Sequence, residues 1–511
     1  MLKKIRTGTS LVIFVLLTCY FLDFAGILPD KLYNLTLIQF IPALLALNIG
    51  VMLALTGITL LAGRIYCSSV CPLGIFQDII SHIARHTFQK KKKYGYRKIN
   101  HLLRWLVVTS VVVLFFLGFS LLVDIIDPYS AYGRITVHLF KPIYLLGNNL
   151  LAYIFNSFGN YTFYRTEILM LSVSAFVIGL LTFLLIAFLA WKYGRLYCNT
   201  ICPVGTVLGF IAKFSFFKVR IDASKCNHCG LCAAKCKSSC INAQEARIDY
   251  SRCVDCFNCL DHCHQQAISF DFRRKEQSPE RTEATVNTHK RQFLLTGLTG
   301  ILTLPSLLAQ EKTKLASGEL REKSLVRQTA ISPPGAISTE HLLRHCTSCH
   351  LCISKCPSKV LKPAFMEYGV GGMMQPLMYF EKGFCNFDCT VCSSVCPSKA
   401  LKPLTKEEKH LTQVGKVIFI ESLCVVYKEG TNCGACSEHC PTQAVKMLPY
   451  KDGLTIPFID QDICVGCGGC EFICPARPHR AIHVEGNRVQ ERAKAFTHEQ
   501  KEETEVTDFG F

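Results

Sequence analysis

The chain has 511 residues, half of them apolar, and a formal net charge of +18. This composition is too apolar for an ordinary soluble protein of this length. The positive charge does not indicate nucleic-acid binding, because the basic residues lie where membrane topology would place them. The 30 cysteines are not a disulfide framework, because almost all follow a CxxCxxCxxxC rhythm that disulfides do not need and iron–sulfur clusters do.

Four apolar segments, residues 10–28, 39–62, 105–123 and 168–191, are each long enough to cross about 30 Å of hydrocarbon. We therefore expect an α-helical membrane domain over residues 1–217. Residues 135–158 are also apolar, but Lys141, Pro142, Asn148 and Asn149 interrupt them. An interfacial or re-entrant segment is favoured there over a further span.

The basic stretch at residues 85–98 follows the second span and contains no acidic residue. By the positive-inside rule, it and the N-terminus lie in the cytoplasm and residues 124–167 lie outside. Asp124, Asp127 and Glu167 then stand at the outer membrane edge, either exchanging protons with a quinol or as solvated helix ends. This topology predicts a multi-pass protein of the inner membrane.

The stretch GRIYCSSVCPLG at residues 63–74 returns as GRLYCNTICPVG at residues 194–205. Both copies follow an apolar segment, so they indicate an internal duplication. Three interpretations of the CxxxCP thiols remain open: they meet and hold a metal or cluster, they are redox-active pairs, or they pack at helix ends. The residues are Cys67, Cys71, Cys198 and Cys202.

Residues 218–275 contain CxxCxxCxxxC twice, at 226–236 and 253–263. In such a module three thiolates of one motif bind one cubane and the fourth reaches the other. We therefore predict a cytoplasmic two-cluster ferredoxin. One 4Fe–4S cluster would use Cys226, Cys229, Cys232 and Cys263; the other would use Cys253, Cys256, Cys259 and Cys236. Cys240 is left over, as a bystander or a substitute for Cys236.

A linker is expected over residues 276–340. Within it, residues 288–309 resemble a twin-arginine export signal, with Lys290–Arg291 in place of two arginines. A cluster domain is assembled in the cytoplasm and would have to cross the membrane folded, which favours export of the next domain, residues 341–485, to the periplasm. The segment is then cleaved or stays as a fifth span at 293–309. A peripheral helix that leaves everything cytoplasmic is the alternative.

Residues 341–485 contain four more motifs, of which the second and third have enlarged gaps. If adjacent motifs exchange their fourth cysteines, this α+β ferredoxin-like domain holds four clusters, and the chain holds about six. Residues 486–511 are expected to be a charged tail. The predicted ligands are Cys346, Cys349, Cys352, Cys356, Cys385, Cys389, Cys392, Cys396, Cys424, Cys433, Cys436, Cys440, Cys464, Cys467, Cys470 and Cys474.

These motifs carry a resemblance to two protein families. Residues 1–275 resemble the membrane polyferredoxins that serve periplasmic nitrate reductase, the NapH type, whose core recurs in the nitrous oxide regulator NosR. Residues 288–485 resemble the exported ferredoxins of the NapG and MauM type. The resemblance implies a fusion of the two, with electrons flowing from menaquinol or ubiquinol to a periplasmic acceptor.

We therefore expect a membrane-bound electron-transfer protein that is quinol dehydrogenase-like and has no terminal reductase site of its own. It would take electrons from quinol, or from a cytoplasmic donor, and pass them through 4Fe–4S clusters to a periplasmic reductase or electron carrier. Membrane lipid and the quinone pool would be its other partners. The alternative is an assembly or regulatory factor for a respiratory metalloenzyme, whose clusters and CxxxCP thiols reduce or deliver a metal.

Overall fold

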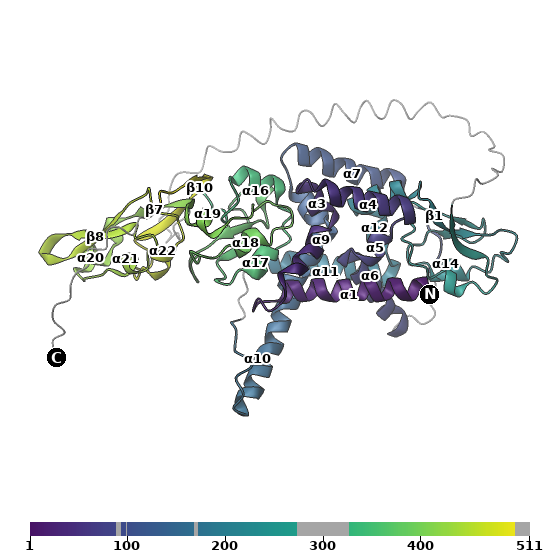
Figure 1. The fold of residues 1–511 in the computed structure, drawn as a ribbon, viewed down its shortest axis with the longest axis horizontal. Helices are drawn as coiled ribbons and strands as arrows, with labels where there is room; N and C mark the ends of the chain where they lie inside the picture. Colours follow the sequence, from purple (N-terminus) through teal and green to yellow (C-terminus); the bar gives the residue numbers. More distant parts are fainter. Residues whose placement is uncertain (88–93, 99, 168–171, 273–326, 496–511) are drawn as a thin grey trace, which may run out of the picture. The chain divides into compact units, whose positions relative to one another are not determined.

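The computed structural model describes residues 1–87, 94–98, 100–167, 172–272 and 327–495, which belong to one compact unit (Figure 1). The predicted export signal at residues 288–309, with the fifth span, lies outside the described residues. We call residues 1–213 the helical bundle, residues 217–272 the N-terminal module and residues 327–495 the C-terminal module.

The helical bundle consists of helices of very different length. Its principal elements are α1 (Leu2–Leu22), α3 (Phe40–Leu45), α4 (Ile49–Ala62), α5 (Ile65–Ser69), α6 (Pro72–Thr87), α7 (His101–Phe116), α8 (Leu121–Ile126), α9 (Pro128–Ile135), the π-helical turn η2 (Thr136–Phe140), α10 (Lys141–Ser157), α11 (Val173–Tyr193), α12 (Leu196–Thr200) and α13 (Pro203–Ala212).

Two helices of the described chain, α1 and α11, are long and apolar enough to cross a membrane, where the sequence predicted four. The predicted span 39–62 is divided, because Leu47 takes a positive φ of 51° between α3 and α4. This leaves α4 with 14 residues, and α7, in the third predicted span, has 16. At about 1.5 Å per residue neither reaches about 30 Å.

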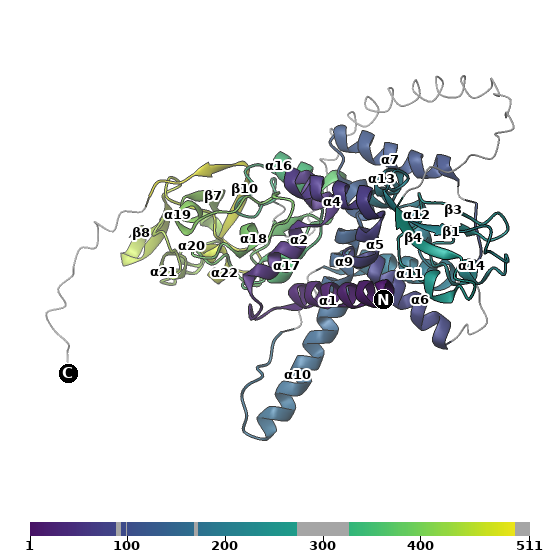
Figure 2. The same cartoon turned by 45° about the vertical axis from the view of Figure 1, so that its right-hand side comes forward.

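The surfaces of the two long helices are mostly exposed. Only 28% of the apolar window of α1 and 22% of that of α11 are buried. A core helix of a soluble protein would be mostly buried, so these two helices are not core helices of that kind, although a signal sequence near the N-terminus would pass the same length test as α1. The segment that Lys141 and Pro142 interrupt forms the turn η2 and the helix α10, which extends away from α11 (Figures 1 and 2).

The N-terminal module is built from two short antiparallel ladders. Strand β1 (Phe217–Ile221) pairs with β4 (Ile268–Phe272), and β2 (Ile241–Asn242) pairs with β3 (Arg247–Ile248). The helix α14 (Leu231–Lys235) contains the third cysteine of its motif, the 3-10 turn η3 (Leu260–His262) follows the third cysteine of the other, and both lead to the fourth. This arrangement is the α+β ferredoxin-like one that the motifs predicted.

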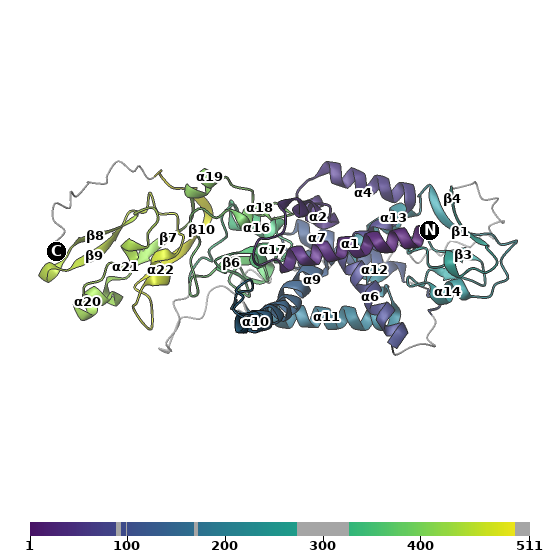
Figure 3. The same ribbon diagram turned by 60° about the horizontal axis from the view of Figure 1, so that its bottom comes forward.

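The C-terminal module contains three further antiparallel ladders of the same kind (Figure 3). Its ladders are β5 (Leu361–Pro363) with β6 (Pro376–Met378), β7 (Thr412–Phe419) with β10 (Ile482–Arg492), and β8 (Val445–Pro449) with β9 (Thr455–Ile459). Its helices are α16 (Thr339–His345), α17 (Leu351–Lys355), α18 (Val391–Ser394), α19 (Lys406–His410), α20 (Val425–Glu429), α21 (Ala435–Glu438) and α22 (Gly469–Ile473).

The C-terminal module is larger than the predicted domain at both ends. Ile331 and Ala336, placed in the linker by the sequence, are fully buried in its core. Strand β10 continues to Arg492, where the sequence predicted a tail from residue 486. The predicted boundaries at residues 341 and 485 were wrong. A few buried residues in a polar segment, or a strand with one face in solvent, hardly change the amino-acid composition from which the boundaries were predicted.

The C-terminal module contacts the end of α1. The Lys355 ammonium lies 2.6 Å from the Asp23 carboxylate, and the Ser354 hydroxyl donates to the Phe21 carbonyl at 2.6 Å. Gly133 on α9 lies so close to this module that an added Cβ would be 2.4 Å from the Cys349 carbonyl oxygen. The module is therefore fixed to the bundle by close backbone contact, as well as by this ion pair.

Asp124 and Asp127 are each 1% exposed, so their interpretation as solvated helix ends was wrong. The Asp124 carboxylate accepts a hydrogen bond from the Ser348 hydroxyl at 2.9 Å, and Arg134 donates to the Ser348 carbonyl at 3.3 Å. Asp127 accepts from Ser130 and caps α9. These carboxylates belong to the junction with the C-terminal module.

The junction should weaken as the pH rises. Burial raises the pKa of Asp124 from 3.8 to about 8. The folded state therefore binds more protons than the unfolded state between about pH 4 and pH 8, and stability falls through that window and levels off above it. Asp124→Asn mimics the neutral form. We expect the melting temperature of this variant in detergent, relative to that of wild type, to rise steadily from pH 5 to pH 8. The rise corresponds to a relative gain in unfolding free energy of about 1 kcal/mol per pH unit. Parallel pH profiles of the two proteins would contradict this.

Candidate functional site

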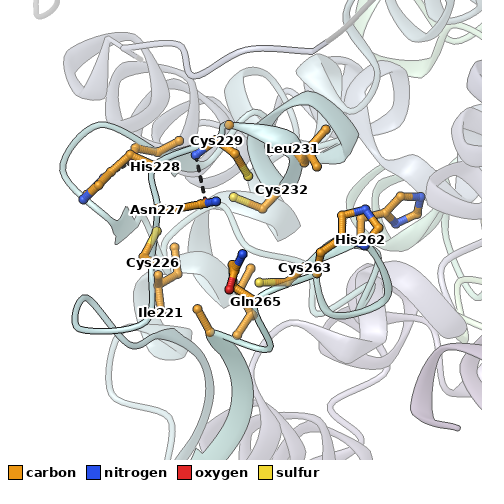
Figure 4. Close-up of a pocket in the computed structure, with 15 residues that line it drawn as sticks. Ile221, Cys226, Asn227, His228, Cys229, Leu231, Cys232, His262, Cys263 and Gln265 are labelled. Carbon is orange, nitrogen blue, oxygen red and sulfur yellow. Dashed lines mark hydrogen bonds between the residues drawn. The ribbon is translucent and has the colours of Figure 1, made fainter.

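The cysteines of the N-terminal module gather in two groups. Figure 4 shows Cys226, Cys229, Cys232 and Cys263 pointing their sulfur atoms into one cavity. His228 and Gly230 take left-handed backbone conformations there, with φ of 54° and 74°, which wraps the loop around the cavity. The second cavity is lined by Cys236, Cys253, Cys256 and Cys259, with Cys240 beside them. These are the two sets that the motif spacing predicted.

The C-terminal module brings its cysteines together in the same exchanged pattern. One cavity is lined by Cys356, Cys385, Cys389 and Cys392, and another by Cys424, Cys433, Cys436 and Cys474. The remaining cysteines interact electrostatically as two further sets, Cys346, Cys349 and Cys352 with Cys396, and Cys464, Cys467 and Cys470 with Cys440. The enlarged gap of the third motif contains the helix α20.

These donor sets fit 4Fe–4S clusters. Each offers four thiol sulfurs around one space, which matches the ligand count of a cubane. Backbone amides already point at several sulfurs: Ser348 donates to Cys346 and Leu401 donates to Cys396, both at 3.4 Å. Amide donors of this kind stabilise thiolate charge on a cluster.

The four CxxxCP cysteines meet inside the helical bundle, at what we call the four-thiol site. Cys67 lies on α5 and Cys198 on α12, while Cys71 and Cys202 immediately precede α6 and α13. Each is at most 4% exposed, and all four belong to one buried core. The fold thus brings the duplicated motifs together.

Each repeat holds the cysteine helix of the other through its arginine. Arg64 donates to the Cys198 carbonyl at 3.3 Å, and Arg195 donates to the Cys67 carbonyl at 2.7 Å. Gly74 and Gly205 lie against the first-cysteine carbonyl of their own repeats, those of Cys67 and Cys198. An added Cβ would lie 2.3 Å from the Cys67 carbonyl oxygen at Gly74. Only glycine therefore fits the last position of the motif.

The tyrosines of the repeats point toward other parts of the bundle. Tyr66 donates to the Gln39 side chain at 3.0 Å, and Tyr197 donates to the Ile126 carbonyl at 2.6 Å. Ile126 directly precedes Asp127. The sequence singled out these tyrosines as part of the motif and could not assign them partners, because the partners lie far away in the chain.

The burial of the four-thiol site argues against thiol exchange. Burial raises the pKa of the Cys71, Cys198 and Cys202 thiols, whereas exchange chemistry needs an accessible thiolate. The Arg64 guanidinium is fully buried and its Nη2 lies 3.8 Å from the Cys67 sulfur. A buried cation requires a nearby negative charge, and thiolates on a metal or cluster would supply it. Among the described residues, no group of three or more Cys, His, Asp or Glu side chains is placed to hold a single metal ion, so these observations favour a cluster over a lone metal ion.

Sequence reasoning missed Asp78 on α6, which ties the site together. Its carboxylate accepts two 2.8 Å hydrogen bonds from Arg195, and Lys237 and Arg6 lie 3.1 and 3.7 Å away. Burial alone would raise the pKa of Asp78, but Arg195 and Lys237 hold it below its ordinary value. The only signal in the sequence was a lone acid four residues after the motif.

The N-terminal module contacts the four-thiol site directly. Arg64 donates through its side chain to the Ser251 carbonyl at 3.0 Å and through its amide to Asp255 at 2.9 Å. From the other repeat, Asn199 donates to the Ser238 carbonyl at 3.1 Å. Cys256, of the second cysteine set, belongs to the same buried core as the four thiols.

Gly74→Ala should damage the four-thiol site, because its Cβ would collide with a backbone oxygen that cannot move aside. We expect a loss of about 1–3 kcal/mol, seen as a lower melting temperature of the detergent-solubilised protein. Gly57 on α4 is the matched control, since an added Cβ there meets nothing within 4 Å. Gly57→Ala should leave stability unchanged or raise it by about 0.5–1 kcal/mol. Equal melting temperatures for the two variants would refute this packing.

Models of two kinds of iron–sulfur domain match this chain. A 4Fe-4S binding domain matches residues 44–92 and 175–222, each of which contains one CxxxCP motif. A 4Fe-4S dicluster domain matches residues 249–360 and another matches 431–477. No solved structure matches.

Curated relatives cover different parts of the chain. The putative electron transport protein YccM of Escherichia coli (strain K12) is 28% identical over 42% of this chain, which spans about half (53%) of YccM. The methylamine utilization ferredoxin-type protein MauM of Methylobacillus flagellatus is 27% identical over 39% of this chain and 86% of its own length. The ferredoxin-type protein NapF of E. coli K12 is 30% identical over 28% of this chain and 80% of NapF. The chain therefore belongs to the ferredoxin-type 4Fe-4S proteins.

Proposed function

We propose that this protein carries electrons across the inner membrane, from quinol or a cytoplasmic donor to a periplasmic reductase or carrier. Iron–sulfur electron transfer is the function of its ferredoxin-type domains. The membrane, the direction and the partners are the proposed part. One observation carries the proposal: the four-thiol site lies inside the helical bundle, with direct connections toward both cysteine-rich modules.

The connections run in both directions from the four thiols. Toward the N-terminal module, Arg64 and Asn199 donate to the carbonyls of Ser251 and Ser238, each two residues from a cysteine of the second set. Toward the C-terminal module, Tyr197 binds the Ile126 carbonyl, and the neighbouring Asp124 binds Ser348 between Cys346 and Cys349. Electron transfer between redox centres needs fixed separations, and these hydrogen bonds hold the cysteine sets at fixed positions.

The two modules contact opposite ends of α1. Lys3 pairs with Asp261 of the N-terminal module at 2.9 Å, and Asp23 pairs with Lys355 of the C-terminal module at 2.6 Å. The 21 residues of α1 extend about 31 Å, which is close to the hydrocarbon thickness of a bilayer. This supports a cytoplasmic N-terminal module and a periplasmic C-terminal module. The exposed apolar side chains of α11 would face lipid.

The proposed donor site is a cavity of about 1250 Å³ between α1, α6 and the N-terminal module. Its wall includes the apolar side chains of Leu11 and Ile79 and the imidazoles of His82 and His86. Asn258 and His262, which also line it, are each adjacent to a cluster cysteine. A quinol needs such an apolar wall for its ring and tail, and proton acceptors for its hydroxyls.

In the proposed mechanism the protein's own residues hold the clusters, balance their charge and exclude water. A bound 4Fe–4S cluster supplies a one-electron carrier. Twenty-four cysteines would hold the six clusters that the sequence predicted, and the four-thiol site would hold a metal or a further cluster. Arg64 would offset part of the negative charge of its thiolates. The burial of Arg64 keeps water from competing for that interaction.

Metal delivery, the alternative function, has less support. A site that hands a metal to another protein must expose its ligands to that partner. The four CxxxCP thiols are at least 96% buried within the bundle, so a partner could not reach them without opening the fold. A site that only relays electrons needs no such access.

Changing Cys67, Cys71, Cys198 and Cys202 to serine should remove the central metal site and leave the two modules intact. We expect purified protein to lose up to about four iron atoms per chain and one distinct EPR signal, while the other signals persist. Cys19→Ser is the control, because Cys19 lies exposed on α1 and belongs to none of the cysteine sets. Unchanged iron content and spectra in the fourfold variant would show that the four thiols bind no redox centre.

A further inference from the structure

The second cavity of the N-terminal module has five cysteines around it instead of four. Cys240 lines it together with Cys236, Cys253, Cys256 and Cys259. The sulfur atoms of Cys240 and Cys236 are 3.4 Å apart, and the Cys240 side chain also interacts with that of Cys253. Cys240 is 1% exposed. It is therefore no bystander, since it touches two predicted ligands of one cluster.

Four of the five other motifs indicate which of the two neighbours is the ligand; in the remaining motif the position four residues after Cys474 is Pro478. Cys236 stands at the fourth position of CxxCxxCxxxC, as Cys263, Cys356, Cys396 and Cys440 do in their motifs. Cys240 stands four residues later. The corresponding residues of those four motifs cannot bind iron and pack as small apolar side chains: Ala267, Val360, Ala400 and Ala444, all at most 3% exposed. Cys236 is thus the ligand, and Cys240 replaces an apolar packing residue.

The fourth cysteines of two other motifs are approached by a hydroxyl group from two residues further on. Ser398 lies 3.7 Å from the Cys396 sulfur, and Thr442 lies 3.7 Å from the Cys440 sulfur. The equivalent residue after Cys236 is Ser238, whose buried hydroxyl has no hydrogen-bond partner among the described residues. Of the three fourth cysteines, only Cys236 has a thiol, that of Cys240, closer to its sulfur than any hydroxyl group.

The loop that carries Cys240 is held in place on both sides. Ser238 and Ser239 accept hydrogen bonds through their carbonyls from Asn199 at 3.1 Å and Arg252 at 3.0 Å. The Cys240 carbonyl accepts from the Asp249 amide at 2.9 Å. The thiol therefore keeps its position against the ligand sulfurs when the cluster changes charge.

We propose that Cys240 keeps its proton and donates an S–H hydrogen bond to the ligand thiolate of Cys236, which raises the reduction potential of this cluster. A thiolate on iron has no proton and can only accept, so the unligated Cys240 is the donor. Hydrogen bonds to cluster sulfurs help set the potential, and a donor favours the reduced, more negative state. No bond to iron is made or broken.

This inference rests on the proposed electron relay and gives the cluster a place in it. Cys256, another ligand of the same cluster, shares the buried core of the four-thiol site. A raised potential makes this cluster the position at which an electron in the N-terminal module collects before it passes to the four-thiol site.

The test is an EPR-monitored redox titration of the full-length protein in detergent. Cys240→Ala should keep all of the iron and shift the midpoint potential of one N-terminal cluster downward. Cys240→Ser, whose hydroxyl can also donate, should restore much of the shift. Ala267→Cys places a thiol at the equivalent position of the other motif, and should raise the midpoint potential of the other cluster.

Three results would overturn the inference. If the midpoint potential is the same in Cys240→Ala and in wild type, and the wild-type signal is intact, then Cys240 is only a packing residue. Loss of about four irons from that variant would make Cys240 a ligand. A wild-type protein without this cluster signal would refute the cluster assignment as well. If Cys240→Ala does not fold, the serine and Ala267→Cys variants decide the question alone.

Discussion

The arrangement of the bundle depends on the buried carboxylate of Asp78. It binds Arg195 of the second repeat, while Arg6 of α1 and Lys237 of the N-terminal module lie within ion-pair distance. Three segments that are distant in sequence therefore share one anion. A buried ion pair contributes little net stability, but removing one partner is costly because the other charge is left unpaired. The network acts mainly to fix which surfaces meet.

The two buried arginines of the repeats connect the four-thiol site to the N-terminal module in different ways. Asp78 satisfies Arg195, whereas Arg64 donates to backbone carbonyls, Asn199 and a cysteine sulfur, and forms no ion pair with a carboxylate in the described part of the chain. One of these partners, Ser251, belongs to the N-terminal module, and another, Asn199, donates to the Ser238 carbonyl of the same module. Of the two equivalent arginines, Arg195 is thus paired with a carboxylate, whereas the positive charge of Arg64 is left facing the thiols.

Much of the cysteine arrangement could be predicted from the sequence, because ligand spacing reflects a local requirement of the cluster. The exchange of Cys236 and Cys263 between motifs is an example. Helix lengths were harder, since hydropathy cannot show that Leu47 breaks an apolar run. The partners of Arg64, Asp78 and Tyr197 were out of reach, because they come from segments 70 or more residues away. Asp124 was misread for the same reason: its partner Ser348 is 224 residues distant.

The most direct test of the account is transfer between the two modules through the four-thiol site. The protein would be reconstituted in vesicles with its N-terminal module outward, and a reduced soluble ferredoxin, which cannot cross the bilayer, would be added outside. Freeze-quench EPR would then follow the clusters of the C-terminal module. The account predicts that they become reduced in wild type and stay oxidised when Cys67 and Cys198 are changed to serine. Equal rates of reduction in both proteins would contradict it.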